Sequence, residues 1–416
     1  MKKKKYINIT IKTFLILICS IILGTLLLIG SYLLPVEPMI KNAQDVKTVF
    51  EKEGMYPVLI KGYYNTMLDN FSDSIILNQA IYKGNESVVH KAMYVYRTNK
   101  YNPVYDVIHT IKNDEELEKT DYSRYWHGDM IILKPLLLLF SYSQIRIINT
   151  FIQSILLFLI IYFMIKRNLF CKIPDLLICI LFIFPFFIGK SLQYSNLYNI
   201  FLISTLIMLV FNEKLKNKYI YFFMIVGVLT SYFDLLSFPI LGLGMPLLFN
   251  ILLNRKETLK ENILDIIKYS LFWGIGYAGM WVGKWIIGSI LCNDNLFEVA
   301  LDKVKYRSSS GSTNRIDPVI KNLKIYFNKT YLIILTPILC YHLYCIIRNI
   351  KKITKKVLIG CIPYLIISLI PIMWYIVMSN HSEIHFWFTN KSLIVSIYSL
   401  LLMLHHLHDK NKLNEN

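Results

Sequence analysis

Long apolar stretches alternate with short lysine-rich segments along this chain. The first stretch, residues 14–34, follows the basic residues 2–5 and contains about 20 residues, enough to cross a hydrocarbon core of roughly 30 Å as a helix. A cleaved signal peptide is the alternative. However, this stretch is longer than a typical signal core, and no small-residue cleavage site clearly follows it. We therefore expect an uncleaved membrane anchor.

Repeated along the chain, this pattern predicts about ten membrane-spanning helices. They are expected near residues 12–34, 145–165, 173–189, 197–211, 219–236, 238–253, 269–290, 331–347, 357–378 and 392–407. A long polar block separates the first two. The expected fold class is therefore an all-α polytopic integral membrane protein with a large first extracytoplasmic loop that contains interfacial helices.

Composition supports this class and excludes an ordinary soluble one. Of 416 residues, 55% are hydrophobic and 17% are charged, and a soluble fold could not cover that much apolar surface. The formal net charge of +18 would by itself fit a nucleic-acid partner. The cations lie instead in short loops at the ends of apolar stretches, which is the positive-inside pattern. No nucleic-acid partner is expected, and membrane lipids are.

The distribution of lysine and arginine predicts the orientation of the chain. The loops expected inside are basic and contain Lys166, Arg167, Lys172, Lys214, Lys216, Lys218, Arg255, Lys256, Lys260, Lys268, Arg348, Lys351, Lys352, Lys355 and Lys356. The short outer loops carry only Lys190 and Lys391. This asymmetry predicts a multi-pass plasma-membrane protein with both termini in the cytoplasm.

The predicted topology divides the chain into a small number of parts. They are a cytoplasmic N-terminus (1–11), a first transmembrane helix (12–34), an extracytoplasmic loop (35–144), a helix bundle (145–407) with an outer loop at 291–330, and a cytoplasmic tail (408–416). Residues 131–140 are apolar but too short to span, and Lys134 and Pro135 interrupt them. They form either a separate interfacial helix or the start of a longer, kinked span.

Cofactor motifs are scarce in this sequence. The seven cysteines lie mostly in apolar stretches, so no disulfide framework is expected, and no Cys/His spacing is typical of a zinc site. A Walker loop and a Gly-x-Gly-x-x-Gly turn are absent from the sequence, which argues against binding of cytoplasmic ATP. No cofactor is therefore expected, although dependence on a divalent metal and the oligomeric state stay open.

Acidic residues concentrate in the first outer loop, which holds 14 of the 27 in the chain. Asp69 and Asp73 are four residues apart and would share one face of a helix, where two like charges repel mildly unless a cation or a proton separates them. A helix cap explains either residue equally well. We interpret them as candidate catalytic carboxylates, with Asp234, which closes the fifth predicted span, as a third.

Other polar groups are expected at the same membrane face. Arg124, His127 and Asp129 combine a cation, an imidazole and a carboxylate, a set that can bind phosphate or relay a proton, or that simply anchors the loop edge. Arg307 and Arg315 flank a stretch of small residues that fits either a phosphate-binding loop or a disordered tip.

The densest ionisable group follows the ninth predicted span. His381, Glu383 and His385 lie within five residues of one another, and Lys391 comes shortly afterwards. Their spacing is not that of a zinc protease, because the glutamate lies between the two histidines at the wrong offset. Imidazoles and an ammonium at a membrane surface favour a catalytic or ligand-binding role.

The predicted topology resembles that of the class C glycosyltransferases. The resemblance rests on an inside-facing N-terminus, one span, a large outer loop with acids, an interfacial helix and a hydrophobic bundle. It implies an enzyme that takes a sugar from a polyprenyl-phosphate donor and passes it to a glycan or lipid acceptor of the cell envelope. It also implies Asp69 as base or acceptor-orienting acid, Asp73 as second acid, and a phosphate site at His381, His385 and Lys391.

Two other classes remain open from the sequence. A multi-span transporter or lipid flippase would place ionisable groups at mid-membrane and use broken helices in repeated halves. The predicted spans carry little charge at mid-depth and no repeat is visible, which favours the enzyme. Glycines near residues 242–246 and 274–276 still permit breaks or close packing. A non-catalytic membrane assembly partner is the third possibility.

Overall fold

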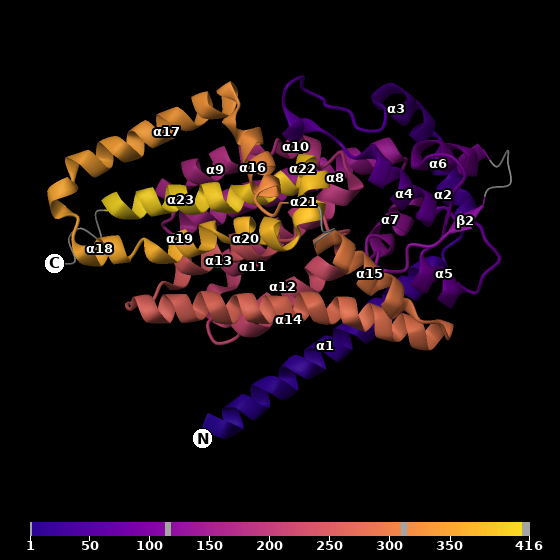
Figure 1. Cartoon of the computed structure of the whole chain (residues 1–416), viewed down its shortest axis with the longest axis horizontal. Helices are drawn as coiled ribbons and strands as arrows, with labels where there is room; N and C mark the ends of the chain where they lie inside the picture. Colours follow the sequence, from indigo (N-terminus) through magenta and orange to yellow (C-terminus); the bar gives the residue numbers. More distant parts are fainter. Residues whose placement is uncertain (1, 113–117, 309–313, 410–416) are drawn as a thin grey trace.

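The structure is a computed structural model that describes residues 2–112, 118–308 and 314–409. Helices dominate this part of the chain, and its one sheet pairs two short antiparallel strands, β1 (Arg97–Thr98) and β2 (Lys119–Thr120). Most long helices run along the long axis of the molecule, and the short helices of the N-terminal third gather at one end (Figure 1). The predicted all-α class is therefore confirmed.

The N-terminal third consists of one long helix and a group of short ones. Their bounds are α1 (Lys2–Tyr32), α2 (Val36–Asn42), α3 (Asp45–Glu53), η1 (Tyr64–Thr66), α4 (Asn70–Ala80), α5 (Val88–Tyr94), α6 (Pro103–Lys112) and α7 (Met130–Leu137). Buried apolar side chains of this group pack on α1, α12 and α14 in one hydrophobic cluster. The loop predicted between the first two spans is thus a folded unit.

The bundle begins with α8 (Tyr142–Lys166), which a capping box at Ser141 and Gln144 separates from α7. The helices that follow are η2 (Phe170–Lys172), α9 (Ile173–Phe182), α10 (Pro185–Ile188), α11 (Leu192–Leu215), α12 (Tyr219–Phe233), α13 (Leu241–Asn254) and α14 (Leu259–Cys292). Residues 131–140 therefore form mainly a separate helix, which ends before the second span begins.

The C-terminal part completes the bundle. It contains α15 (Leu296–Ser308), α16 (Asp317–Lys324), η3 (Ile325–Phe327), α17 (Lys329–Arg348), η4 (Ile350–Lys352), α18 (Lys355–Ile359), α19 (Ile362–Ser368), α20 (Ile370–Val377), α21 (Ser379–Ile384), α22 (Phe386–Thr389), η5 (Asn390–Ser392) and α23 (Leu393–His408). The N-terminal end of α1 and the C-terminal end of α23 both lie toward the side away from α2–α7 (Figure 1).

Seven helical segments of the described chain are long and apolar enough to cross a membrane. They are Ile7–Tyr32, Tyr142–Lys166, Leu192–Leu215, Leu259–Cys292, Lys329–Arg348, Lys355–Val377 and Phe386–His408. This supports a membrane protein, but it does not bear out a count of about ten. Of the other expected spans, Tyr219–Phe233 and Leu241–Asn254 are shorter apolar helices.

The expected span at 173–189 is broken. Phe184 has a φ of 50°, and Pro185 starts a new short helix after it, so α9 ends at Phe182. Proline disfavours helical backbone at the residue before it, and a left-handed residue ends the regular hydrogen-bond ladder. Sequence hydropathy alone does not detect such a break.

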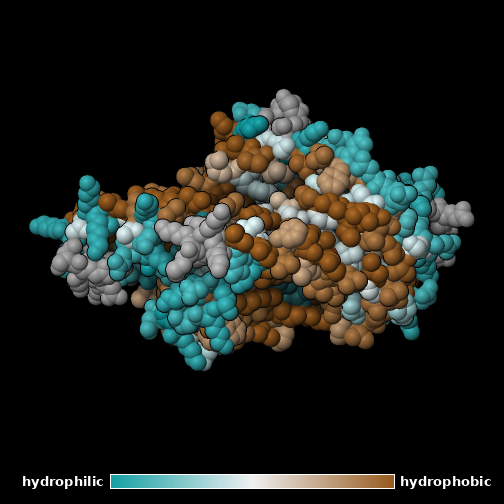
Figure 2. All heavy atoms as spheres, turned by 90° about the horizontal axis from the view of Figure 1, so that it is seen from below, coloured by the Kyte–Doolittle hydropathy of each residue, from teal (hydrophilic) through white to brown (hydrophobic). Residues whose placement is uncertain are grey.

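One face of the molecule has the polarity expected in a lipid bilayer. Figure 2 shows hydrophobic side chains over the middle of this face and hydrophilic side chains at both ends of the long axis. Large apolar side chains of the long helices, such as Phe151, Phe158 and Leu271, are more than half exposed. So much exposed apolar surface is typical of helices that face lipid.

Small residues bring the two most closely packed helices of the bundle together. A Cβ added at Gly276 of α14 would lie 2.1 Å from the carbonyl oxygen of Met224 in α12. A Cβ at Gly227 of α12 would lie 2.1 Å from the carbonyl oxygen of Trp273. The two backbones therefore touch, as small residues permit between membrane helices, and this contact fixes α14 beside the candidate site.

Candidate active site

Asp69 is positioned by the start of α4. It is the N-cap of this helix, and its Oδ1 accepts a hydrogen bond from the backbone N–H of Ser72 at 2.9 Å. Only 2% of its surface is exposed. Burial, together with the neighbouring charge of Asp73, raises the pKa of the Asp69 carboxyl to about 6, although the hydrogen bond from Ser72 opposes this shift. A carboxylate with such a pKa is suited to proton transfer near neutral pH.

A cavity of about 90 Å³ opens at Asp69. It is lined by Tyr56, Asp69, Phe71, Ser72, Ile75, Tyr122, Tyr125, Gln193, Leu235, Arg307, His381, His385 and Phe388. Four of the residues predicted from the sequence thus meet here, although they come from segments more than 300 residues apart. The volume corresponds to roughly six to nine water-sized groups, enough for the reacting atoms of a substrate.

Two histidines hold the guanidinium of Arg307. Its Nη1 lies 3.1 Å from His381 Nδ1 and 2.7 Å from His385 Nε2. A guanidinium only donates, so both of these ring nitrogens are acceptors. His381 then carries its proton on Nε2, which lies 2.5 Å from the carbonyl oxygen of Leu236, and His385 carries its proton on Nδ1. Both imidazoles are therefore neutral.

The electrostatics agree with neutral imidazoles. Burial lowers the pKa of His385 to about 3, with the charge of Arg307 as a second cause. Burial also holds the pKa of His381 well below its usual range, and His385 and Arg307 add to the shift. The sequence favours these histidines as cations for a phosphate. In this geometry they orient Arg307 instead, and Arg307 supplies the positive charge among the residues that line the cavity.

An apolar groove of about 300 Å³ lies next to the cavity. It is lined by Arg124, Tyr125, Leu236, Tyr277, Ala278, Trp281, Val282, Trp285, Ala300, Lys303, Val304, Arg307, Trp374 and Met378. Most of these side chains belong to α14 and α15. Tyr125 and Arg307 line both hollows, so the guanidinium stands where the polar cavity meets the apolar groove.

Asp73 has a different environment from Asp69. Its two carboxylate oxygens accept hydrogen bonds from the hydroxyls of Tyr142 (2.9 Å) and Ser191 (3.1 Å) and from the backbone N–H groups of Leu192 (2.9 Å) and Gln193 (3.2 Å). These donors belong to α8 and to the first turn of α11. Asp73 does not line the cavity, and its bonds tie three helices together.

The cluster predicted at residues 124–129 separates into two parts. The guanidinium of Arg124 lies 3.9 Å from the ring centre of Tyr122 and faces the apolar groove. His127 and Asp129 lie behind it, each with less than 5% of its surface exposed. Neither Asp129 oxygen meets a hydrogen-bond donor among the described residues, and burial raises the pKa of this carboxyl to about 7. Asp129 lines a separate hollow of about 30 Å³.

Asp234 lies beside the candidate site without lining it. Its Oδ1 accepts hydrogen bonds from the backbone N–H and the hydroxyl of Ser237, both at 2.7 Å. Burial raises the pKa of its carboxyl to about 7. Leu235 and Leu236, the next two residues, line the cavity and the groove respectively. The turn that Asp234 stabilises therefore forms part of the wall between them.

The remaining predicted residues lie outside the cavity. Lys391 is fully buried, and its ammonium lies 3.4 Å and 3.2 Å from the carbonyl oxygens of Asn65 and Trp387. Glu383 is half-buried in α21, and Arg315 is exposed just before α16. The stretch between Arg307 and Arg315 lies partly outside the described residues. The structure thus brings Arg307, but not Arg315, to Asp69.

Several lining residues are not predicted from the sequence. Tyr56 and Gln193 carry no local signal, because a single tyrosine or glutamine near an apolar stretch is common. Tyr125 has the sequence context of an interface anchor, and Trp281 and Trp374 that of ordinary residues of spans. Five tyrosines and tryptophans recur every four residues along α14, from Tyr269 to Trp285, and the last three of them line the groove. This spacing is the signal available for an aromatic groove wall.

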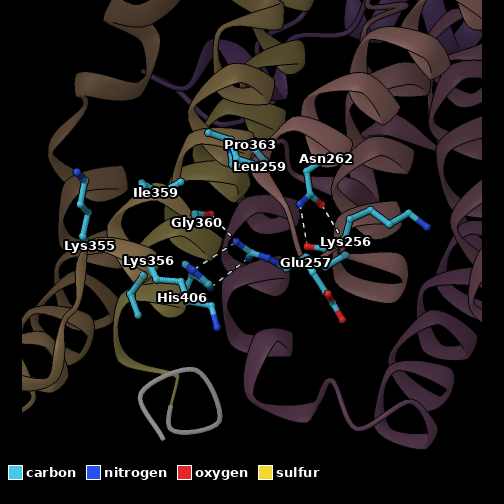
Figure 3. Close-up of a pocket in the computed structure, with 12 residues that line it drawn as sticks. Lys256, Glu257, Leu259, Asn262, Lys355, Lys356, Ile359, Gly360, Pro363 and His406 are labelled. Carbon is cyan, nitrogen blue, oxygen red and sulfur yellow. Dashed lines mark hydrogen bonds between the residues drawn. The ribbon is translucent and has the colours of Figure 1, made fainter. Parts of the chain in front are cut away.

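A larger hollow of about 870 Å³ lies at the opposite end of the bundle. Figure 3 shows Lys256 and Glu257 on one side of it and Lys355 and Lys356 on the other. At its floor, the Arg255 guanidinium donates to the carbonyl oxygen of Gly360 at 2.6 Å and lies 3.1 Å from His406 Nδ1. Two of the basic loops that the sequence predicts to face the cytoplasm therefore lie together at this hollow.

No known protein family, curated protein or solved structure matches this chain. Its function is therefore inferred from the geometry of the site.

Proposed function

We propose that this protein is a membrane glycosyltransferase. It would move a sugar from a polyprenyl-phosphate donor to a cell-envelope acceptor on the outer face of the membrane. One observation supports this most: a buried carboxylate of raised pKa and a histidine-held guanidinium line one cavity, and this cavity adjoins an apolar groove. Transfer from a lipid-linked sugar needs an apolar site for the lipid chain, a cation for the phosphate and a base at the attacking acceptor hydroxyl.

In the proposed reaction Asp69 is the base. The acceptor hydroxyl attacks the anomeric carbon, its proton passes to the Asp69 carboxylate, and the bond from the sugar to the donor phosphate breaks. The phosphate leaves with the bonding electron pair. Its charge is stabilised by Arg307, whose direction is fixed by His381 and His385 before the reaction begins.

The lipid chain of the donor would occupy the apolar groove. A volume of about 300 Å³ is at the lower end of ligand pockets and would hold only the first units of a long chain, so the rest would extend into the bilayer. Trp281 and Trp374 supply apolar walls, and Arg307 sits at the junction where the chain meets its phosphate.

Arg307→Ala is expected to weaken binding of a long-chain polyprenyl phosphate by about 10- to 100-fold, because a hydrogen bond to a charged group contributes about 1.5–3 kcal/mol. Binding is measured as the ligand-induced rise in thermal unfolding temperature of the detergent-purified protein. Arg307→Lys should retain part of the affinity. Arg315→Ala is the matched control, since Arg315 is exposed outside the cavity. Equal affinity of Arg307→Ala and wild type would contradict the phosphate site.

The transfer rate is expected to depend on pH through Asp69. The carboxylate, not the carboxylic acid, accepts the proton, so kcat/KM for the acceptor should fall about tenfold per pH unit below a pKa of about 6 and level off above it. Initial rates of sugar transfer in membranes, measured from about pH 4.5 to 8, report this limb. A rate that is constant across pH 5 to 7 would exclude a base of this pKa.

We propose that the end of the bundle with the hollow lined by Lys256, Lys355 and Lys356, the basic hollow, is cytoplasmic. Helices α2–α7 and the cavity are then outside, as the cation distribution predicts. Cysteines introduced singly at the exposed Lys61 and Asn217, in a variant without the native cysteines, test this orientation. A membrane-impermeant thiol reagent added to intact cells should label position 61 and should not label position 217. The reverse pattern would overturn the topology.

A transporter or lipid flippase is the second candidate. One observation favours it: the interior of the bundle contains ionisable side chains, including Lys284 in α14 and Asp175 in α9. Ionisable residues within spans often mark a transport pathway. Sugar transfer by the purified protein in detergent would favour the enzyme over the transporter, because detergent micelles have no two compartments between which transport could occur.

A further inference from the structure

A buried group of histidines joins three helices at the end of the bundle away from the candidate site. His342 of α17 and His405 and His408 of α23 each offer a ring nitrogen, and these nitrogens lie within 4.8 Å of one another. Asp175 of α9 completes the group. The three helices pack against one another pairwise, so the cluster is built into the fold.

The contacts in this cluster have the pattern of a metal site with an orienting carboxylate. His342 Nε2 lies 3.0 Å from Asp175 Oδ1, and its other nitrogen, Nδ1, faces His408 Nε2 at 2.8 Å. In metal sites a histidine typically donates one ring N–H to a carboxylate and ligates through the other nitrogen. Asp175 therefore orients His342 so that its Nδ1 points at His408.

The contact between His405 and Asp175 is not a hydrogen bond. His405 Nδ1 and Asp175 Oδ2 lie 3.5 Å apart, and neither has a hydrogen-bond partner among the described residues. Both residues are more than nine-tenths buried. Buried polar atoms normally have partners, and a cation between these lone pairs would supply one.

We propose that His342, His405 and His408 bind a divalent transition-metal ion, with Asp175 as their hydrogen-bonded carboxylate or as a fourth ligand. Imidazole nitrogens and a carboxylate are a ligand set that suits Zn²⁺. In a tetrahedral site ligand atoms are about 3.3 Å apart, so His342 and His408 would separate by about 0.5 Å around the ion. The ion would fasten α23 to α17 and α9.

Zinc uptake by the purified full-length chain tests this proposal. After removal of any affinity tag and treatment with a chelator, wild type titrated with Zn²⁺ is expected to bind about one ion per chain and to unfold at a higher temperature. Co²⁺ in its place should give the intense visible absorption of a four- or five-coordinate site. His342→Ala and His405→Ala should each lose most of the bound ion.

His406→Ala is the matched control, because His406 is on the same helix, contacts Arg255 and is not one of the three clustered histidines. It should bind as much Zn²⁺ as wild type. Wild type that binds no stoichiometric Zn²⁺ would overturn the proposal and leave a purely hydrogen-bonded cluster. Unchanged uptake and an unchanged Co²⁺ spectrum in the double variant His342→Ala/His405→Ala would overturn it too. The wild-type titration and spectrum decide the question even if a variant does not fold.

Discussion

Asp69→Asn is expected to abolish sugar transfer and to leave the fold intact. An amide cannot accept the proton of an attacking hydroxyl, so the rate should fall by at least about 100-fold, the lower bound for loss of a positioned base. Asparagine is as good an N-cap as aspartate and can still accept the hydrogen bond from Ser72. Transfer is measured as labelled sugar moved from membrane lipid into acceptor material.

The same variant should be at least as stable as wild type above pH 6. The pKa of Asp69 is raised from about 3.9 in the unfolded chain to about 6, so the folded state loses up to about 3 kcal/mol as pH rises through this window. Asparagine does not titrate and avoids this loss. Asp302→Asn, a change at an exposed acid of α15, is the matched control for both readouts. Full activity in Asp69→Asn would reject Asp69 as base.

Asp73→Asn is expected to have the opposite profile. In either orientation its NH₂ group would face one hydroxyl and one backbone N–H that now donate to the carboxylate. The hydroxyl can turn and accept, but the buried backbone N–H cannot. A buried unsatisfied donor costs about 1–3 kcal/mol, so the free energy of unfolding should fall by about that amount. Thermal unfolding in detergent, followed by tryptophan fluorescence, measures the loss.

The comparison of the two aspartates separates a catalytic from a structural carboxylate. If Asp73→Asn unfolds at the wild-type temperature, the network at the start of α11 contributes little to stability. If it also loses transfer, Asp73 acts in the reaction as the resemblance to class C glycosyltransferases implies. We expect instead that any activity loss in Asp73→Asn follows the loss of folded protein.

The sequence predicted the long helices well because their apolar stretches match the thickness of a bilayer. It failed where backbone geometry decides, as at Phe184 and Pro185, which divide an apolar stretch into two short helices. The count of spans depends on such breaks and on helices as short as α13. A hydropathy pattern shows neither where a helix breaks nor whether a short apolar helix spans the membrane.

The candidate site was predicted residue by residue but not as a set. The acidic first outer loop suggested Asp69, and a cation beside a stretch of small residues suggested Arg307. The polar residues after the ninth predicted span suggested His381 and His385, yet nothing in these spacings indicated that the four residues meet. Of the two explanations that the sequence left open for Asp69, the structure shows the helix cap. Asp69 is the N-cap of α4 and has non-helical backbone angles, so it does not share a helix face with Asp73. Its side chain therefore turns to the cavity, while Asp73 turns to α11.

The histidine cluster was missed for a similar reason. The sequence suggested no zinc site, since its Cys/His spacings fit no known pattern. His405 and His408 are three residues apart on one helix, whereas His342 and Asp175 come from two others. Ligands assembled from separate helices become visible only when the packing of the bundle is known.

The proposed site can be tested by an electron cryomicroscopy structure of the inactive Asp69→Asn variant with a long-chain polyprenyl phosphate in a lipid nanodisc. We expect the phosphate to lie within hydrogen-bond distance of Arg307 and the chain to run between Trp281 and Trp374. A phosphate bound instead at the basic hollow beside Arg255, or a groove that stays empty at saturating ligand, would contradict the proposed donor site.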